Sequence, residues 1–163
     1  MAQEGYFPIT TVTGSGNPTY IDITGIPATY AHLCLIGNMA STRAVDYEGF
    51  DQWQRAGMTS STTVNAHRNT GQATMYLLDS IGTSVSSTII PMVECMIFGY
   101  ADTSRYTNIW AKGGFASTSA SYGSNKLWSG SWLNTAAVSS MRITAGTGNF
   151  TTTSRLTLYG FNS

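Results

Sequence analysis

The sequence predicts an all-β protein, a jelly-roll-like β-sandwich of about eight antiparallel strands. Apolar runs of roughly five to nine residues, rich in Ile, Val, Thr, Tyr and Trp, recur along the chain and end at Gly, Asn, Asp or Ser. Turn clusters separate them, as at 14–17, 69–71 and 147–149, and helical periodicity is nearly missing. No linker or repeat divides the 163 residues, so one domain is expected over 1–163.

Each expected strand is a run of this kind between turn residues. In chain order, the strands are predicted at residues 19–25, 30–37, 73–79, 93–100, 105–114, 125–132, 139–146 and 155–161. In 139–144, Met141 and Ile143 alternate with polar residues, as is typical of a strand with one face in solvent.

Two of these strands carry further information. In 93–98 both faces are apolar apart from Glu94, which predicts a central strand or a strand that faces a neighbouring subunit. In 155–161, Leu156 and Leu158 are expected to be buried, so the last strand is expected to be paired within a sheet.

Residues 38–72 are expected to form a long irregular loop region. Within it, 45–57 has no period of two and is interpreted as an ordered loop. The alternative is a short helical turn that ends at Gly57.

The chain carries very few charges. Eight Lys and Arg balance eight Asp and Glu, and charged residues make up 10% of the sequence, against roughly 25% in ordinary soluble domains. Without a basic excess, nucleic acid is not expected as a partner. Because a nearly uncharged, hydroxyl-rich surface lacks the repulsion that keeps copies apart, we expect a subunit of a larger assembly.

The sequence also indicates where the protein is made. Its longest apolar runs, such as 96–101, are far shorter than the roughly 20 residues that span a membrane, so no membrane partner is expected. The N-terminus lacks the basic and apolar parts of a secretory signal, which implies synthesis in a cytoplasm. Cys34 and Cys95 each lie in an apolar run and are expected to be buried reduced thiols, with a single disulfide as the alternative.

Residues suited to catalysis are scarce. His32 lies within an expected strand and is interpreted as a structural or surface imidazole, whereas His67 lies near a turn as a candidate contact residue. The acidic residues Asp46, Glu48 and Asp51 lack calcium-loop spacing and are interpreted as a solvated loop. With no zinc, phosphate-loop or serine-hydrolase motif, we expect no enzyme and no cofactor.

Aromatic residues are the remaining candidates for function. Their rings suit stacking on a saccharide, but packing in the core or between subunits is the favoured interpretation. The candidate interface residues are Trp53, His67, Arg68, Tyr106, Trp110, Trp128 and Trp132.

The C-terminal part carries one more pattern. A Trp and a Thr-Ala pair precede an Ile-rich strand, a Gly-Asn-Phe turn, a Ser and a last strand that ends in Leu-Tyr-Gly and an apolar residue. The residues are Trp132, Thr135, Ala136, Ile143, Gly148, Asn149, Phe150, Ser154, Leu158, Tyr159, Gly160 and Phe161. This pattern resembles the ending of small virion proteins and tail-associated β-domains of tailed bacteriophages. Residues 25–37 and 98–115 also resemble segments of that group, whereas 38–72 matches nothing in it.

The resemblance implies a non-enzymatic virion structural protein. We expect a capsid decoration (cement) subunit on the capsid surface, made in the bacterial host cytoplasm, which clamps adjacent major capsid proteins as a homotrimer. The alternative is a receptor- or glycan-binding tip of a tail or head fibre that binds a host-surface glycan through 38–72 and the tryptophans. A bacterial lectin-like module outside any phage is a third hypothesis.

Overall fold

The computed structural model describes residues 5–42, 52–54, 91–116, 123–145 and 148–162. Within these residues the backbone forms nine strands and no helix. The strands are β1 (Phe7–Thr13), β2 (Tyr20–Thr24), β3 (His32–Asn38), β4 (Gln52–Gln54), β5 (Met92–Phe98), β6 (Thr107–Ala116), β7 (Gly123–Trp132), β8 (Ser140–Thr144) and β9 (Arg155–Phe161).

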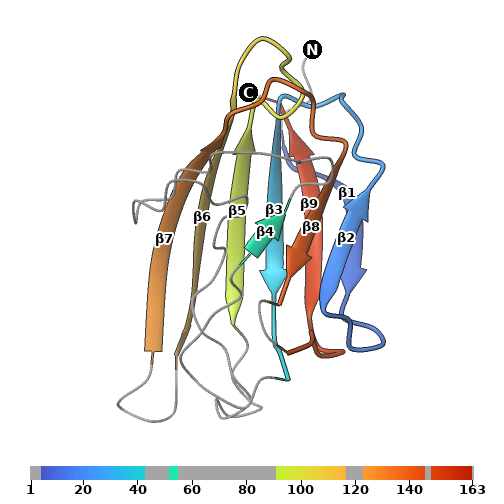
Figure 1. Ribbon diagram of the computed structural model, residues 1–163, viewed down its shortest axis with the longest axis vertical. Coiled ribbons are helices and arrows are strands. Elements are labelled where there is room, and N and C mark those ends of the chain that lie inside the picture. The colour runs from blue at the N-terminus through green and yellow to red at the C-terminus, as the bar shows by residue number, and fades with distance from the viewer. Residues whose placement is uncertain (1–4, 43–51, 55–90, 117–122, 146–147, 163) are drawn as a thin grey trace.

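The strands form two antiparallel sheets. One has six strands in the order β1-β9-β3-β5-β6-β7 and the other has three in the order β2-β8-β4. Among the described strands, consecutive ones from β1 to β5 lie in different sheets, whereas β5, β6 and β7 follow one another within the large sheet. Figure 1 shows the small sheet in front of the large one. The predicted antiparallel β-sandwich is confirmed.

Sequence patterns located most of the strands. β2, β3 and β5 to β9 coincide with predicted runs, and the predicted strand at 73–79 lies outside the described residues. β1 was not among the predicted strands, and it contains Pro8. Proline is tolerated there because β1 is an edge strand, and its register shifts between Pro8 and Thr10.

One prediction fails in the region expected to be a loop. Residues 45–57 were interpreted as a loop with a helical turn as the alternative, but Gln52–Gln54 form strand β4 and pair with β8. A strand of three residues is too short to show a period of two. Its strand conformation comes from pairing with the edge of β8, which the local sequence does not encode.

The core lies between the two sheets. Every second residue of the strands points inward, so branched and aliphatic side chains of both sheets meet. Those exposed by at most 1% include Leu33, Leu35, Ile97 and Leu158 of the large sheet and Ile23, Met141 and Ile143 of the small sheet.

Strand β9 lies inside the large sheet rather than at its edge. Leu158 is opposite Thr10 of β1 on one side and Leu35 of β3 on the other. Leu156 and Leu158 are fully buried, as the sequence predicted. The last strand therefore ties the first strand of the chain to β3.

The turn before β9 is held by hydrogen bonds to the end of β3. Gly148 has φ 79°, a left-handed conformation that favours glycine, and Phe150 is fully buried. The buried hydroxyl of Ser154 accepts a hydrogen bond from the Ala40 amide and donates one to the Ala40 carbonyl, both at 2.9 Å. These contacts give the Gly-Asn-Phe and Ser positions of the C-terminal pattern a structural role.

Gly160 marks a close contact between β9 and the ring of Tyr30. A Cβ atom at this position would overlap the ring of Tyr30, which stacks on Phe7 with ring centroids 6.0 Å apart. We expect Gly160→Ala to lower the free energy of unfolding by about 1–3 kcal/mol, the range for overpacked sites. Denaturant titration measures this change.

A Tyr30→Ala background serves as the control for this prediction. Because the clash partner is then missing, Gly160→Ala should cost clearly less in that background. An equal loss in both backgrounds would contradict the assignment of the effect to the Tyr30 ring.

Candidate interface on the six-stranded sheet

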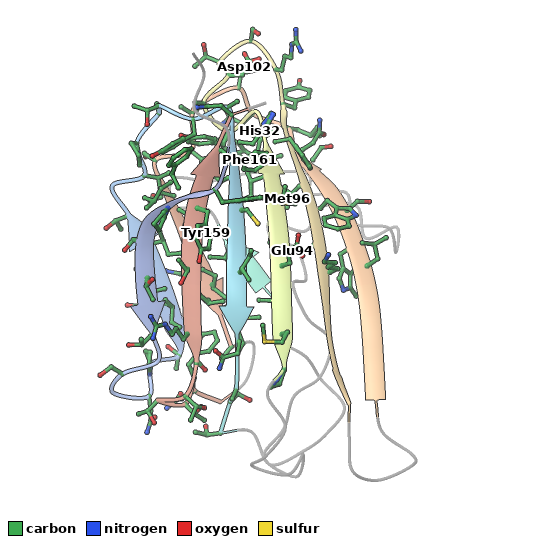
Figure 2. All side chains as sticks on the ribbon, turned by 180° about the vertical axis from the view of Figure 1, so that it is seen from behind. His32, Glu94, Met96, Asp102, Tyr159 and Phe161 are labelled. Atoms are coloured by element: carbon green, nitrogen blue, oxygen red, sulfur yellow. The ribbon has the colours of Figure 1, made fainter. Side chains whose placement is uncertain are left out.

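The large sheet has one surface that the small sheet does not cover. We call the side chains that point away from the small sheet the outer face, and Figure 2 looks onto it. Its larger members come from β3, β5, β6, β7 and β9 and are His32, Ile36, Met92, Glu94, Met96, Phe98, Trp110, Lys112, Leu127, Arg155, Tyr159 and Phe161. The apolar side chains that β5 contributes to this face include those of the run 93–98, which the sequence showed to be apolar on both faces apart from Glu94.

The outer face exposes large apolar side chains to solvent. Leu127 is 62% exposed, Met92 52% and Phe98 38%. Contiguous apolar side chains on a protein surface mark contact sites more often than isolated ones do. The composition of this face, rich in Met and aromatic residues, is that of the central part of protein interfaces.

Aromatic rings gather at one end of the outer face. The His32 ring lies 5.5 Å from the ring of Phe98 and 5.2 Å from that of Phe161. Tyr6 continues the cluster, with its ring 5.1 Å from Phe161. The Gly99 amide donates a hydrogen bond of 3.1 Å to His32 Nδ1, so that nitrogen carries no proton and the ring is held in place.

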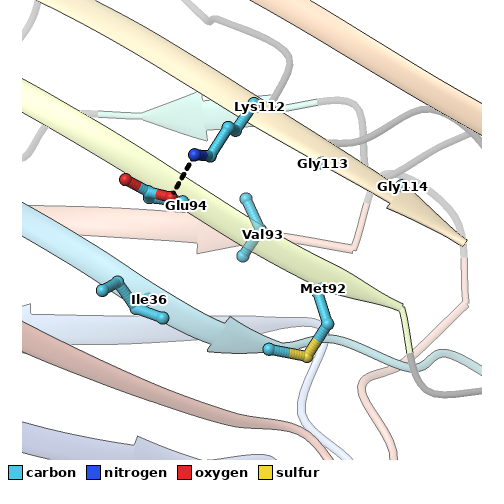
Figure 3. A pocket seen from close by; sticks show the side chains of 7 residues that line it. All are labelled: Ile36, Met92, Val93, Glu94, Lys112, Gly113 and Gly114. Carbon is cyan, nitrogen blue, oxygen red and sulfur yellow. Dashed lines mark ion pairs between the residues drawn. The ribbon is translucent and has the colours of Figure 1, made fainter.

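An ion pair occupies the middle of the outer face. Lys112 Nζ lies 2.7 Å from Glu94 Oε2 and 5.3 Å from the centre of the Trp110 ring. Beside the pair is a hollow of about 390 Å³, whose floor is bare backbone at Gly113 and Gly114 (Figure 3). Ile36 and Met92 complete its apolar wall.

The opposite surface of the sandwich is more polar. On the small sheet, Arg142 Nε and Nη2 donate to both carboxylate oxygens of Asp22, at 2.6 and 2.7 Å, and the guanidinium lies 3.9 Å from the Tyr20 ring centre. The hydrogen bonds from Arg142 hold the pKa of Asp22 below its ordinary value.

The candidate interface residues of the sequence do not form one group. Trp110 is half-buried on the outer face, and Tyr106, just before β6, is 54% exposed. Trp128 and Trp132 are both 7% exposed and point to the inner side of β7.

The remaining candidates cannot be located in the same way. Trp53 lies in β4 with its backbone opposite Ile143, but its side chain is outside the described part, as are His67 and Arg68. The acidic residues 46, 48 and 51 and most of the loop region 38–72 also fall outside it.

The two cysteines lie on opposite faces of the sheet. Cys34 is opposite Met96, with its side chain on the outer side, whereas Cys95 is opposite Leu35 and points into the core. Both are fully buried free thiols, so the expected reduced state is found and the alternative disulfide is not. Burial raises the pKa of Cys34 to about 11 and raises that of Cys95 further.

Other kinds of site have less support. Among the described residues, no three His, Cys, Asp or Glu side chains are grouped so that they could hold a metal ion. The same part of the chain contains no helix long and apolar enough to cross a membrane.

In comparisons with protein families, curated proteins and solved structures, no match to this chain was found. What the outer face offers chemically is a largely apolar contact surface with few charges.

We expect both thiols to resist alkylation in the native protein at neutral pH, because the thiolate is the reactive form and burial disfavours it. Treatment with N-ethylmaleimide followed by mass determination should show no modification in buffer and two modified cysteines in denaturant. Rapid labelling of either thiol in buffer would contradict the burial.

The raised pKa of Cys34 also makes stability depend on pH. Below its ordinary value of 9.0 the folded and unfolded forms are both protonated, and above it only the unfolded chain loses the proton until about pH 11. The stability should therefore fall between these pH values, and by less in a Cys34→Ala variant. Chemical unfolding of both proteins at about pH 8 and pH 10.5 measures the difference.

Proposed function

We propose that this chain is a non-enzymatic structural subunit of a bacteriophage virion, which works by contact between protein copies. The observation that carries the proposal is the outer face, where Met92, Phe98 and Leu127 are exposed around an ion pair. The sparse charge of the whole chain supports it, since 10% charged residues suit a protein that is held in an assembly. The resemblance of the C-terminal pattern to phage virion proteins is the reason for proposing a virion as the assembly.

Within a virion, the role we propose is that of a capsid decoration (cement) subunit. It would be made in the bacterial host cytoplasm, bind to the capsid surface and clamp adjacent major capsid proteins. Burying about 400 Å² of apolar surface at about 25 cal/mol per Å² would contribute about 10 kcal/mol for each copy. The loss of translational and rotational freedom on association costs about 4–15 kcal/mol, so the net binding free energy of each copy would be modest. The contributions of many symmetric copies would add up over the capsid.

Self-association also belongs to the proposal. The virion resemblance favours a homotrimer, because local three-fold axes of a shell are where a small clamp can bridge neighbouring subunits. That symmetry stays a prediction.

Heating of particles tests the clamping role. Virions stripped of this subunit should rupture at a lower temperature than intact ones, and adding the purified protein back should restore the higher value. Release of the packaged nucleic acid, followed by dye fluorescence, reports rupture. Equal rupture temperatures for intact and stripped particles would remove the clamping role.

A receptor- or glycan-binding tip is the second candidate function. The exposed rings of Tyr6 and Tyr106, each 54% exposed, favour it, because aromatic faces stack on sugar rings. A glycan array should then give a saturable signal that weakens in Tyr106→Ala and in Trp53→Ala. The absence of binding to any glycan would leave the structural role as the proposal.

A further inference from the structure

We infer that two copies of this chain pair through the outer face, about a two-fold axis that runs parallel to the strands between β5 and β6. The inference rests on the proposed assembly role and names a second copy as the partner of the outer face; it does not depend on the virion. Its basis is the register of the large sheet, which sets outer-face side chains in straight rows across β3, β5, β6 and β7.

The central row is complementary to itself. Ile36 is opposite Glu94, Glu94 is opposite Lys112 and Lys112 is opposite Leu127, so the row reads apolar, negative, positive, apolar. A two-fold axis between Glu94 and Lys112 exchanges the two halves of this row. Each Glu94 then faces the partner's Lys112, and each Ile36 faces the partner's Leu127.

The neighbouring rows obey the same axis. Met96 is opposite Trp110 across β5 and β6, so the axis stacks each thioether on the partner's indole, a favourable contact. Met92 is opposite Gly114, so the axis places the exposed Met92 side chain over the partner's Gly114, in the hollow. The row of Met92 and Gly114 therefore provides both an exposed side chain and the hollow that receives the same side chain of the partner.

Charge and geometry favour a second copy as the occupant. A contact area with a net charge would repel an identical one, but among the described outer side chains of β3, β5, β6 and β7 the charges form one matched pair, Glu94 and Lys112. Rotation about an axis parallel to the strands leaves the strands of both copies running in the same direction. The two large sheets then pack in the aligned arrangement, about 10 Å apart. A second copy is also present whenever the chain is made, so this face need not stay in solvent.

The size of the contact predicts its strength. Four strands about 4.8 Å apart and seven residues long at about 3.4 Å each cover about 460 Å² per copy, or about 900 Å² for the pair. That lies just under the roughly 1,000 Å² expected of a specific interface. We therefore expect a reversible dimer, with monomer at the lowest concentrations.

Sedimentation velocity of the full chain, from about 1 µM to about 200 µM, tests the pairing through the mass of the associated species. Leu127→Glu brings a charge against the partner's Ile36, and Met92→Glu buries a charge over the partner's Gly114, so each should weaken association by about tenfold or more. Both residues are exposed, so the fold should tolerate the changes, which thermal unfolding checks. The matched control is Tyr20→Glu, an exposed aromatic on the small sheet, which should leave association unchanged.

Cross-linking tests the position of the axis. An Ile36→Cys protein mixed with a Leu127→Cys protein should be joined by a bismaleimide that spans about 10 Å, because the two positions face each other across the packed sheets. Either variant alone should give far less product, since identical positions lie on opposite sides of the axis. Tyr20→Cys mixed with Ile36→Cys is the negative control.

The outcomes separate this inference from the proposed function. A monomer at every concentration, the homotrimer that the virion resemblance favours, or a dimer that ignores both Leu127→Glu and Met92→Glu would overturn the pairing. None of these results bears on whether the protein binds capsids. Conversely, a dimer broken by these variants supports the pairing even if stripped and intact virions rupture at the same temperature.

Discussion

The pairing of β9 with strands on both of its sides is the constraint on which the rest of the structure depends. β9 connects β1, from the start of the chain, to β3, and β3 in turn pairs with β5. Because Leu156 and Leu158 are fully buried, a shift of β9 by one residue would turn them out of the core. The register of β9 with β1 and β3 is thereby fixed, and the two surfaces of the large sheet are fixed with it.

Fixing the inner surface determines what the outer face displays. Val93, Cys95 and Ile97 must point into the core, so Met92, Glu94, Met96 and Phe98 must point out. Burial explains the inner set, but nothing in the described part of this chain requires the outer set to be apolar. A sheet held together by its core alone would tolerate polar residues there. This is the reason for the proposal that the outer face contacts another protein surface.

The candidate site was only partly predictable. The pattern of 93–98, apolar on both faces, predicted that β5 is central or faces a neighbour, and it lies between β3 and β6 with apolar residues on the outer face. The tryptophans were less informative, because a Trp in an alternating strand has the same pattern whichever face it takes. Trp110 lies on the outer face and Trp128 on the inner side, a difference set by the register of β6 and β7.

By itself, the sequence determined the all-β class, most strand positions and the burial of the last strand, because these follow from local alternation and turn residues. The tertiary structure alone decided the strand order, the strand conformation of Gln52–Gln54 and the place of β1 at an edge. It also decided that Ile36, Glu94, Lys112 and Leu127 form one row, although they come from four different strands. Such a row depends on which strands are neighbours and in what register, and that is set by long-range pairing and by the packing of two sheets.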